Sequence, residues 1–118
     1  MADRTLKNLS SLAAGGTDNT DSPAIPAGKV VRLVELIAGD INTGPAGVAD
    51  HKSSGYVVQF GIVGTFTEIA FAAMTGNTIR LELKDELVGD GAKFVRVVRQ
   101  NNSGVAKRCP FILRAYDK

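Results

Sequence analysis

The sequence has little of the equipment that enzymes and metalloproteins use. Its 118 residues include one cysteine, one histidine and no tryptophan. A lone Cys109 excludes an internal disulfide framework. One histidine and one cysteine also argue against a structural zinc site, which needs four nitrogen or sulfur ligands. We therefore expect no catalytic residues, no metal and no cofactor, and a protein that is not an enzyme.

Long hydrophobic runs are missing as well. The most apolar stretch, Val30 to Ala38, is interrupted by Arg32 and Glu35. It is far shorter than the ~20 apolar residues that cross a bilayer. The N-terminus also lacks an apolar segment of signal-peptide length. These features predict a soluble protein that is made in the cytoplasm and has no membrane partner.

The two residues most often used in catalysis have plainer interpretations in this sequence. His51 lies between Asp50 and Lys52 in a polar stretch, so we expect an exposed loop histidine. Cys109 alternates in phase with Phe111, so we expect a small buried hydrophobic residue rather than a reactive thiol. The acidic residues fall in loops or on a polar strand face, which predicts a solvated surface.

From Lys29 onward, alternation with a period of two predicts β-strands. The alternation is clearest over Thr78–Lys84, where Ile79, Leu81 and Leu83 share one face. Several short strands with regular turns predict an all-β fold, an antiparallel β-sandwich that is jelly-roll-like. The other predicted strands are Val30–Ala38, Tyr56–Val63, Thr65–Met74 (where a helix over Glu68–Met74 competes), Lys93–Gln100 and Lys107–Asp117.

Several segments predict connections between these strands. Residues 40–55 are rich in glycine and polar residues and predict a long loop. Gly89-Asp90-Gly91 predicts a tight turn. Asn101–Gly104 predicts a hairpin that pairs the strands on either side of it. Pro110 cannot donate to a strand ladder, so we expect its strand to lie at a sheet edge or to be bulged there.

Residues 1–28 differ from the rest because they carry few large apolar side chains. Leu6, Leu9 and Leu12 are three apart, which favours either a short amphipathic helix or an extended segment. We interpret residues 1–28 as an extended N-terminal arm that binds a partner through these three leucines, and residues 29–118 as the β-sandwich domain. Deletion of residues 1–22 is then expected to abolish partner binding and to leave a folded domain.

The net charge of +2 is the sum of two opposite charges. Residues 93–118 carry seven basic groups and one acid (+6), and residues 1–92 carry seven basic groups and eleven acids (−4). A basic face on the last two strands predicts a site for an acidic protein surface, with a simply solvated face as the alternative. The segment has few aromatics for stacking on bases, so we expect no specific nucleic-acid partner. The residues predicted to bind through this face are Arg96, Arg99, Arg108 and Arg114.

Two runs of the sequence resemble a known family. Ile25–Ile37 resembles the first core strand of small jelly-roll proteins of tailed-phage particles. Leu87–Gly104 resembles their closing hairpin, in which a Gly-Asp-Gly turn leads into a strand that ends in an Asn-rich turn. The sequence thus resembles tailed-phage capsid cement or decoration proteins. That resemblance implies a homotrimeric β-sandwich on the capsid surface of a virion, synthesised in the host cytoplasm and bound to the major capsid protein by arms and loops.

The functional hypothesis is therefore a non-enzymatic virion structural protein that reinforces a capsid shell. A phage tail-fibre or host-recognition head that binds a glycan or protein receptor is the alternative. A small coat protein and a small hydrolase on a β-sandwich rank below these two.

Overall fold

A computed structural model describes residues 3–39, 54–73, 78–102 and 106–118. The described residues form β-strands joined by turns, and no helix occurs among them. The predicted loop at 40–55, with His51, and the turn at 75–77 lie almost entirely outside the described residues. The strands are β1 (Leu6–Asn8), β2 (Ser11–Leu12), β3 (Thr17–Asp21), β4 (Val30–Gly39), β5 (Ser54–Gly61), β6 (Thr67–Ala73), β7 (Thr78–Glu82), β8 (Glu86–Val88), β9 (Phe94–Asn101), β10 (Lys107–Arg108) and β11 (Phe111–Asp117).

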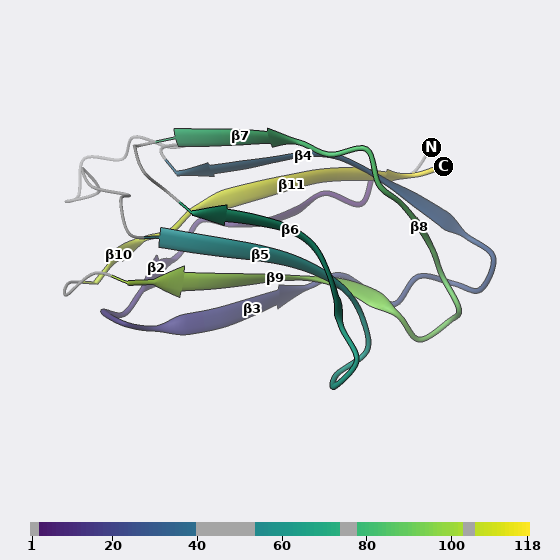
Figure 1. Ribbon diagram of the computed structural model, residues 1–118, viewed down its shortest axis with the longest axis horizontal. Helices are drawn as coiled ribbons and strands as arrows, with labels where there is room; N and C mark the ends of the chain where they lie inside the picture. Colours follow the sequence, from purple (N-terminus) through teal and green to yellow (C-terminus); the bar gives the residue numbers. More distant parts are fainter. Residues whose placement is uncertain (1–2, 40–53, 74–77, 103–105) are drawn as a thin grey trace.

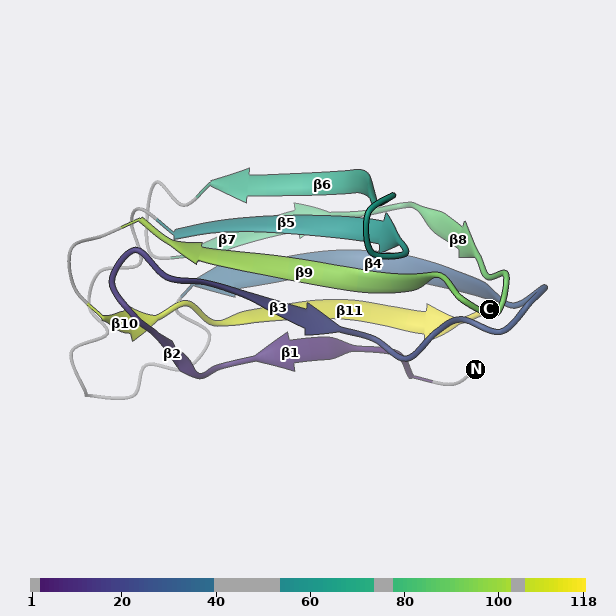
Figure 2. The same ribbon diagram turned by 90° about the horizontal axis from the view of Figure 1, so that it is seen from below.

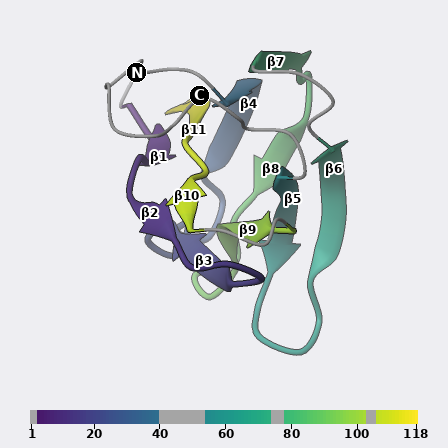
Figure 3. The same ribbon diagram turned by 90° about the vertical axis from the view of Figure 1, so that its left-hand side faces the viewer.

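Two antiparallel sheets pack face to face (Figures 1 and 2). Sheet I has the order β1-β11-β4-β7, with β8 also paired to β4, and sheet II has the order β3-β9-β5-β6. The short pair β2–β10 lies at one side of the sandwich (Figure 3). The predicted all-β antiparallel sandwich is confirmed, and the segment where a helix competed with a strand is the strand β6.

A β-bulge in the central strand β4 explains how a run interrupted by charges becomes core. The register with β11 shifts between Arg114 and Ala115, so Val34 is an extra residue on β4. The extra residue changes the phase of the alternation and turns Arg32 and Glu35 outward. Four β4 side chains on the two sides of the bulge point inward and have no exposed surface: Val31, Leu33, Leu36 and Ala38.

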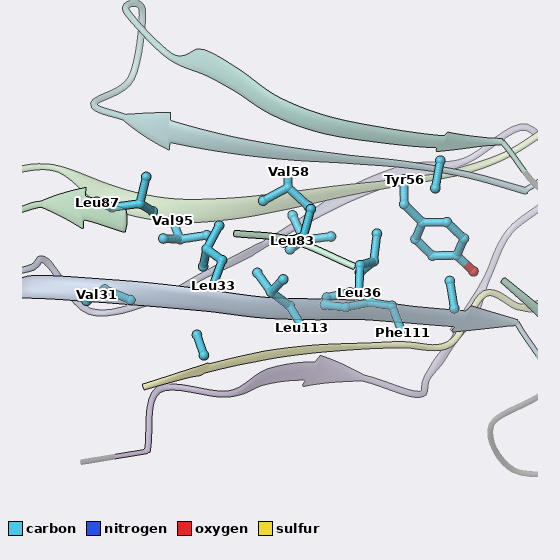
Figure 4. Packing of buried hydrophobic residues seen from close by; sticks show 14 of the residues in the cluster. Val31, Leu33, Leu36, Tyr56, Val58, Leu83, Leu87, Val95, Phe111 and Leu113 are labelled. Carbon is cyan, nitrogen blue, oxygen red and sulfur yellow. The ribbon is translucent and has the colours of Figure 1, made fainter. Parts of the chain in front are cut away.

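The core fills the space between the two sheets (Figure 4). The ring of Tyr56 meets Phe111 edge-on, with 6.1 Å between centroids. Its Oη donates to the Pro110 carbonyl at 3.1 Å, so the phenol is buried without losing a hydrogen bond. Cys109 and Leu113 are also buried, which confirms the inward phase predicted for the last strand. The strand is interrupted at Pro110, between β10 and β11, and β11 is interior rather than at an edge.

The N-terminal segment supplies strands to both sheets, unlike the separate arm that the sequence suggested. β1 pairs with β11, placing Leu6 opposite Leu113, β2 pairs with β10, and β3 pairs with β9 along its whole length. The extended form of the leucine segment is the one found. The polar strand β3, Thr-Asp-Asn-Thr-Asp, has no apolar side chain to signal burial, so its place depends on backbone pairing and on ion pairs.

The predicted hairpin at Asn101–Gly104 is wrong, because the strands on either side of it belong to different sheets. β9 lies between β3 and β5 in sheet II, and β11 lies between β1 and β4 in sheet I. The Asn101 side chain is fully buried and donates to the carbonyls of Leu12 and Ala13, at 3.1 and 3.2 Å. Its backbone N–H donates to the Gly16 carbonyl at 2.9 Å. Asn101 therefore anchors the N-terminal segment.

Candidate functional site

The four arginines predicted to form one basic face do not share a face. Arg99 points into the sandwich. Arg96, opposite Asp21 on β3, lies on the outer face of sheet II, and Arg114, opposite Glu35 on β4, lies on the outer face of sheet I. Arg108 lies in β10, at the side of the sandwich, and only its backbone is described. The predicted basic face is therefore wrong, because β9 and β11 belong to opposite sheets.

Arg99 is fully buried and its five N–H donors all have acceptors. Nε and Nη2 donate to the two carboxylate oxygens of Asp18, at 2.8 and 2.5 Å. The remaining donors reach the Ser10 carbonyl and hydroxyl and the Cys109 carbonyl, at 2.8 to 3.2 Å. Burial alone would lower the pKa of Arg99, but the hydrogen bonds and the charge of Asp18 outweigh it, and the pKa is raised. Arg99 therefore holds the N-terminal segment in place and is not available to a partner.

Arg96 forms a neutralised cluster on the outer face of sheet II. Its guanidinium makes a two-bond contact with the Asp21 carboxylate, at 2.7 and 3.0 Å. It also lies over the rings of Phe66 and Phe94, at 4.7 and 5.5 Å from their centroids, and these rings meet edge-on. The hydrogen bonds that Arg96 donates to Asp21 raise the pKa of Arg96. Because its charge is paired and stacked, Arg96 contributes little free positive charge.

The three leucines predicted to bind a partner lie against the chain's own core. Leu12 is buried in the core and Leu6 packs against it. Leu9 is half-buried. These side chains stabilise the sandwich that contains them, so in this arrangement they offer little apolar surface to another protein.

Exposed large hydrophobic side chains gather instead on the β5–β6 hairpin. The sequence analysis did not predict this exposed apolar surface. Of the four among the described residues, Ile62, Val63 and Phe71 lie on this hairpin and are 42%, 72% and 59% exposed. Its turn projects beyond the sheet (Figures 1 and 3). The Thr65 N–H donates to the Ile62 carbonyl at 3.0 Å, which fixes the turn. The sequence signal was an Ile-Val pair placed directly before the turn glycine.

The outer face of sheet I carries a lattice of ion pairs. Glu35 accepts from Arg114 at 2.9 Å and lies 3.4 Å from Arg80. Glu86 lies 2.5 Å from Lys118 and 3.5 Å from Arg32. The hydrogen bond from Lys118 lowers the pKa of Glu86. The two outer faces thus differ, because sheet I presents charges and sheet II presents apolar and aromatic side chains.

Neither a metal cluster nor a membrane-spanning helix occurs in the part of the chain that the structure describes. Within it, no three His, Cys, Asp or Glu side chains come together as a metal site. The same residues include no helix with the length and hydropathy needed to cross a membrane.

Comparisons with known proteins bear on the fold. No protein-family model matches the chain, and no curated protein matches its sequence. The chain is similar to the Drosophila NLP core, described for pentamer formation and histone binding (13% identity, 98% of each chain, TM-score 0.44). It is similar to a mitogen from Yersinia pseudotuberculosis, at 14% identity and a TM-score of 0.50, over 97% of this chain and 86% of the mitogen chain. It is also similar to a periplasmic inhibitor of g-type lysozyme from Aeromonas hydrophila, at 13% identity and a TM-score of 0.46, over 98% of this chain and 88% of the inhibitor chain. At these identities the likeness shows the fold alone.

Proposed function

We propose that this chain is a non-enzymatic structural protein of a tailed-phage virion. It binds the outside of the capsid as a homotrimer, contacts the major capsid protein and reinforces the shell. This proposal extends the resemblance of two sequence runs to capsid decoration proteins.

The observation that carries the proposal is that these two runs form one structural unit. Val30 and Val31 on β4 pair with Val88 and Leu87 on β8. The Ile25 N–H donates to the Lys93 carbonyl at 2.8 Å, and the Gly91 N–H donates to the Ile25 carbonyl at 3.0 Å. Residues 25–31 and 87–93 therefore build one end of the sandwich together, although more than fifty residues separate them in the sequence.

The physical basis of reinforcement is mass action. A subunit that binds only the assembled shell stabilises that shell, and the stabilisation grows with the logarithm of the ratio of free subunit concentration to Kd. A trimer contacts three lattice positions at once, so modest contacts add up through their high effective concentration.

The test uses the full chain and capsids of the encoding phage from which this protein has been removed. We expect saturable co-sedimentation and a higher temperature of shell opening in calorimetry. Binding and stabilisation should both be absent when an unrelated β-sandwich protein of similar size replaces the chain. An absence of co-sedimentation at saturating concentration would contradict the proposal. Labelling of the tail tip by a specific antibody would favour the receptor-binding alternative.

A further inference from the structure

We infer that the outer face of sheet II, centred on Phe71, is the surface through which copies of this chain associate. The inference rests on the proposed homotrimer and adds which of the two sheet faces makes the contact. Four observations support it: an apolar row, the state of the charges on each face, the form of the β6 edge and the position of the projecting turn.

The apolar row runs across three neighbouring strands. Phe71 on β6 lies opposite Val57 on β5, and Val57 lies opposite Val98 on β9. Residues directly opposite one another share a face of the sheet. That face is the outer one, because Phe71 is 59% exposed whereas Val58, the neighbour of Val57, is fully buried. The row is thus an apolar strip on the outer face, in which Phe71 is exposed and Val57 and Val98 are half-buried.

The charges on this face are compatible with contact between identical copies. Asp21 and Arg96 are paired with each other, and Glu68, opposite Gln59, lies nearer the turn than Phe71 does, so the row of Phe71, Val57 and Val98 itself carries no charge. On sheet I, the acids Glu35 and Glu86 pair with four cations, and Glu82, opposite Glu35, lies on the same face. Burying so many ions against a second copy would cost desolvation energy that the pairs do not fully recover. The four cations are Arg32, Arg80, Arg114 and Lys118.

The form of the β6 edge indicates face-to-face packing rather than strand addition. The β5–β6 register passes from Val58–Ala70 to Gln59–Glu68, so Ile69 is an extra residue on β6. A bulge on an edge strand twists the edge and hinders pairing with another strand. A second copy therefore packs on the outer face, and the turn residues Ile62 and Val63 contact it at the rim.

The first experiment compares two variants at equally exposed positions. Phe71 on sheet II and Val88 on sheet I are both 59% exposed, so neither substitution disturbs the core. Sedimentation equilibrium should show a trimer for the wild-type chain and for Val88→Glu. For Phe71→Glu we expect association weakened about tenfold or more, as for an interface anchor. A monomeric wild-type chain, or a Phe71→Glu variant that associates as the wild type does, would overturn the inference.

A second experiment does not depend on how Phe71→Glu folds. Phe71→Cys and Val88→Cys each add one exposed thiol, and the native Cys109 is fully buried. A short bis-maleimide should cross-link copies of the Phe71→Cys chain and leave the Val88→Cys chain uncross-linked. The reverse pattern would overturn the inference. Capsid co-sedimentation of both variants separates the two proposals: if the chain binds shells but associates through another face, only the inference fails.

Discussion

Arg99 on β9 and Asp18 on β3 form a two-bond ion pair in which the guanidinium is fully buried and the carboxylate side chain is 36% exposed. The pair joins a strand without apolar side chains to the interior of the sandwich. A second pair on the same two strands, Arg96 with Asp21, has the same two-bond form but lies on the outer face. The two pairs provide a matched comparison of buried and surface electrostatics.

Asp18→Ala should lower the free energy of unfolding by about 3 kcal/mol, because it leaves a buried charge without its counter-ion. Asp21→Ala removes the carboxylate of the outer pair and should cost about 1 kcal/mol or less. Urea denaturation followed by circular dichroism measures both. Equal losses in the two variants would contradict the role assigned to burial.

Gly89→Ala should be destabilising because no space exists for a side chain at this position. A Cβ at Gly89 would lie 2.4 Å from both the Cγ2 and the carbonyl oxygen of Ile25, and 2.4 Å from the Pro26 carbonyl oxygen. We expect a loss of about 2–3 kcal/mol. Gly28→Ala is the control, since its Cβ meets nothing within 4 Å and only its φ of +79° opposes the substitution, at about 1 kcal/mol. Urea denaturation measures both variants, and equal unfolding midpoints for Gly89→Ala and Gly28→Ala would contradict the steric argument.

Deletion of residues 1–22 should unfold the protein, contrary to what the sequence suggested. The truncation removes β1, β2 and β3 together with Asp18 and Ser10, and so leaves Arg99 without most of its acceptors. It also removes Ser22, whose hydroxyl accepts from the Val95 N–H at 3.0 Å. Circular dichroism and proton NMR should show loss of the sandwich. A dispersed spectrum with an unchanged unfolding midpoint would show that the segment is dispensable.

The acid sensitivity of the fold should depend in part on Asp90. Its carboxylate accepts from the N–H groups of Lys93 and Ala92, at 2.8 and 2.9 Å, and these bonds lower its pKa from the ordinary 3.8. Since the unfolded chain binds the proton first, the stabilisation is present above the ordinary pKa and is lost as the pH falls through the lower, folded-state value. Asp90→Asn keeps an oxygen acceptor but does not titrate there. The melting temperatures of wild type and variant should therefore differ at neutral pH and converge as the pH falls through the folded-state pKa of Asp90. A difference that stays constant with pH would contradict this assignment.

Local alternation was sufficient to predict most of the strands. Leu83 is buried as its phase requires, and the inward phase of Phe111 and Leu113 follows directly from the last strand. Arg99 was assigned to the basic face because it is charged, although alternation along its strand puts it in phase with the buried Val95 and Val97. The phase of the alternation predicted the burial of Arg99 better than its charge did, because Asp18 on another strand pairs with the guanidinium.

Long-range pairing was not predictable in the same way. The Asn-rich segment after β9 has the local chemistry of a hairpin turn, but Asn101 instead bonds to carbonyls near residue 12. The strand β3 has no hydrophobic pattern, because it lies at a sheet edge and is held by β9 and by two arginines. The residues next to β3 in the sequence carry no pattern that would predict its pairing with β9. The exposed hairpin was missed because alternation places Phe71 on one of the two faces of its strand but does not indicate which face is outside.

The pairing of β1 with β11 has a consequence for how the protein is made. Leu6 lies opposite Leu113, and Arg4 forms an ion pair with Asp117, so the earliest strand has its partner more than a hundred residues downstream. A chain emerging from the ribosome cannot complete sheet I until its last strand has been synthesised. Contacts so distant in sequence also slow folding, because a long loop must close before any energy is gained. Until β11 has been synthesised, the nascent chain therefore exposes the inner face of an unfinished sandwich, because β1 and β4 both lack their partner in sheet I.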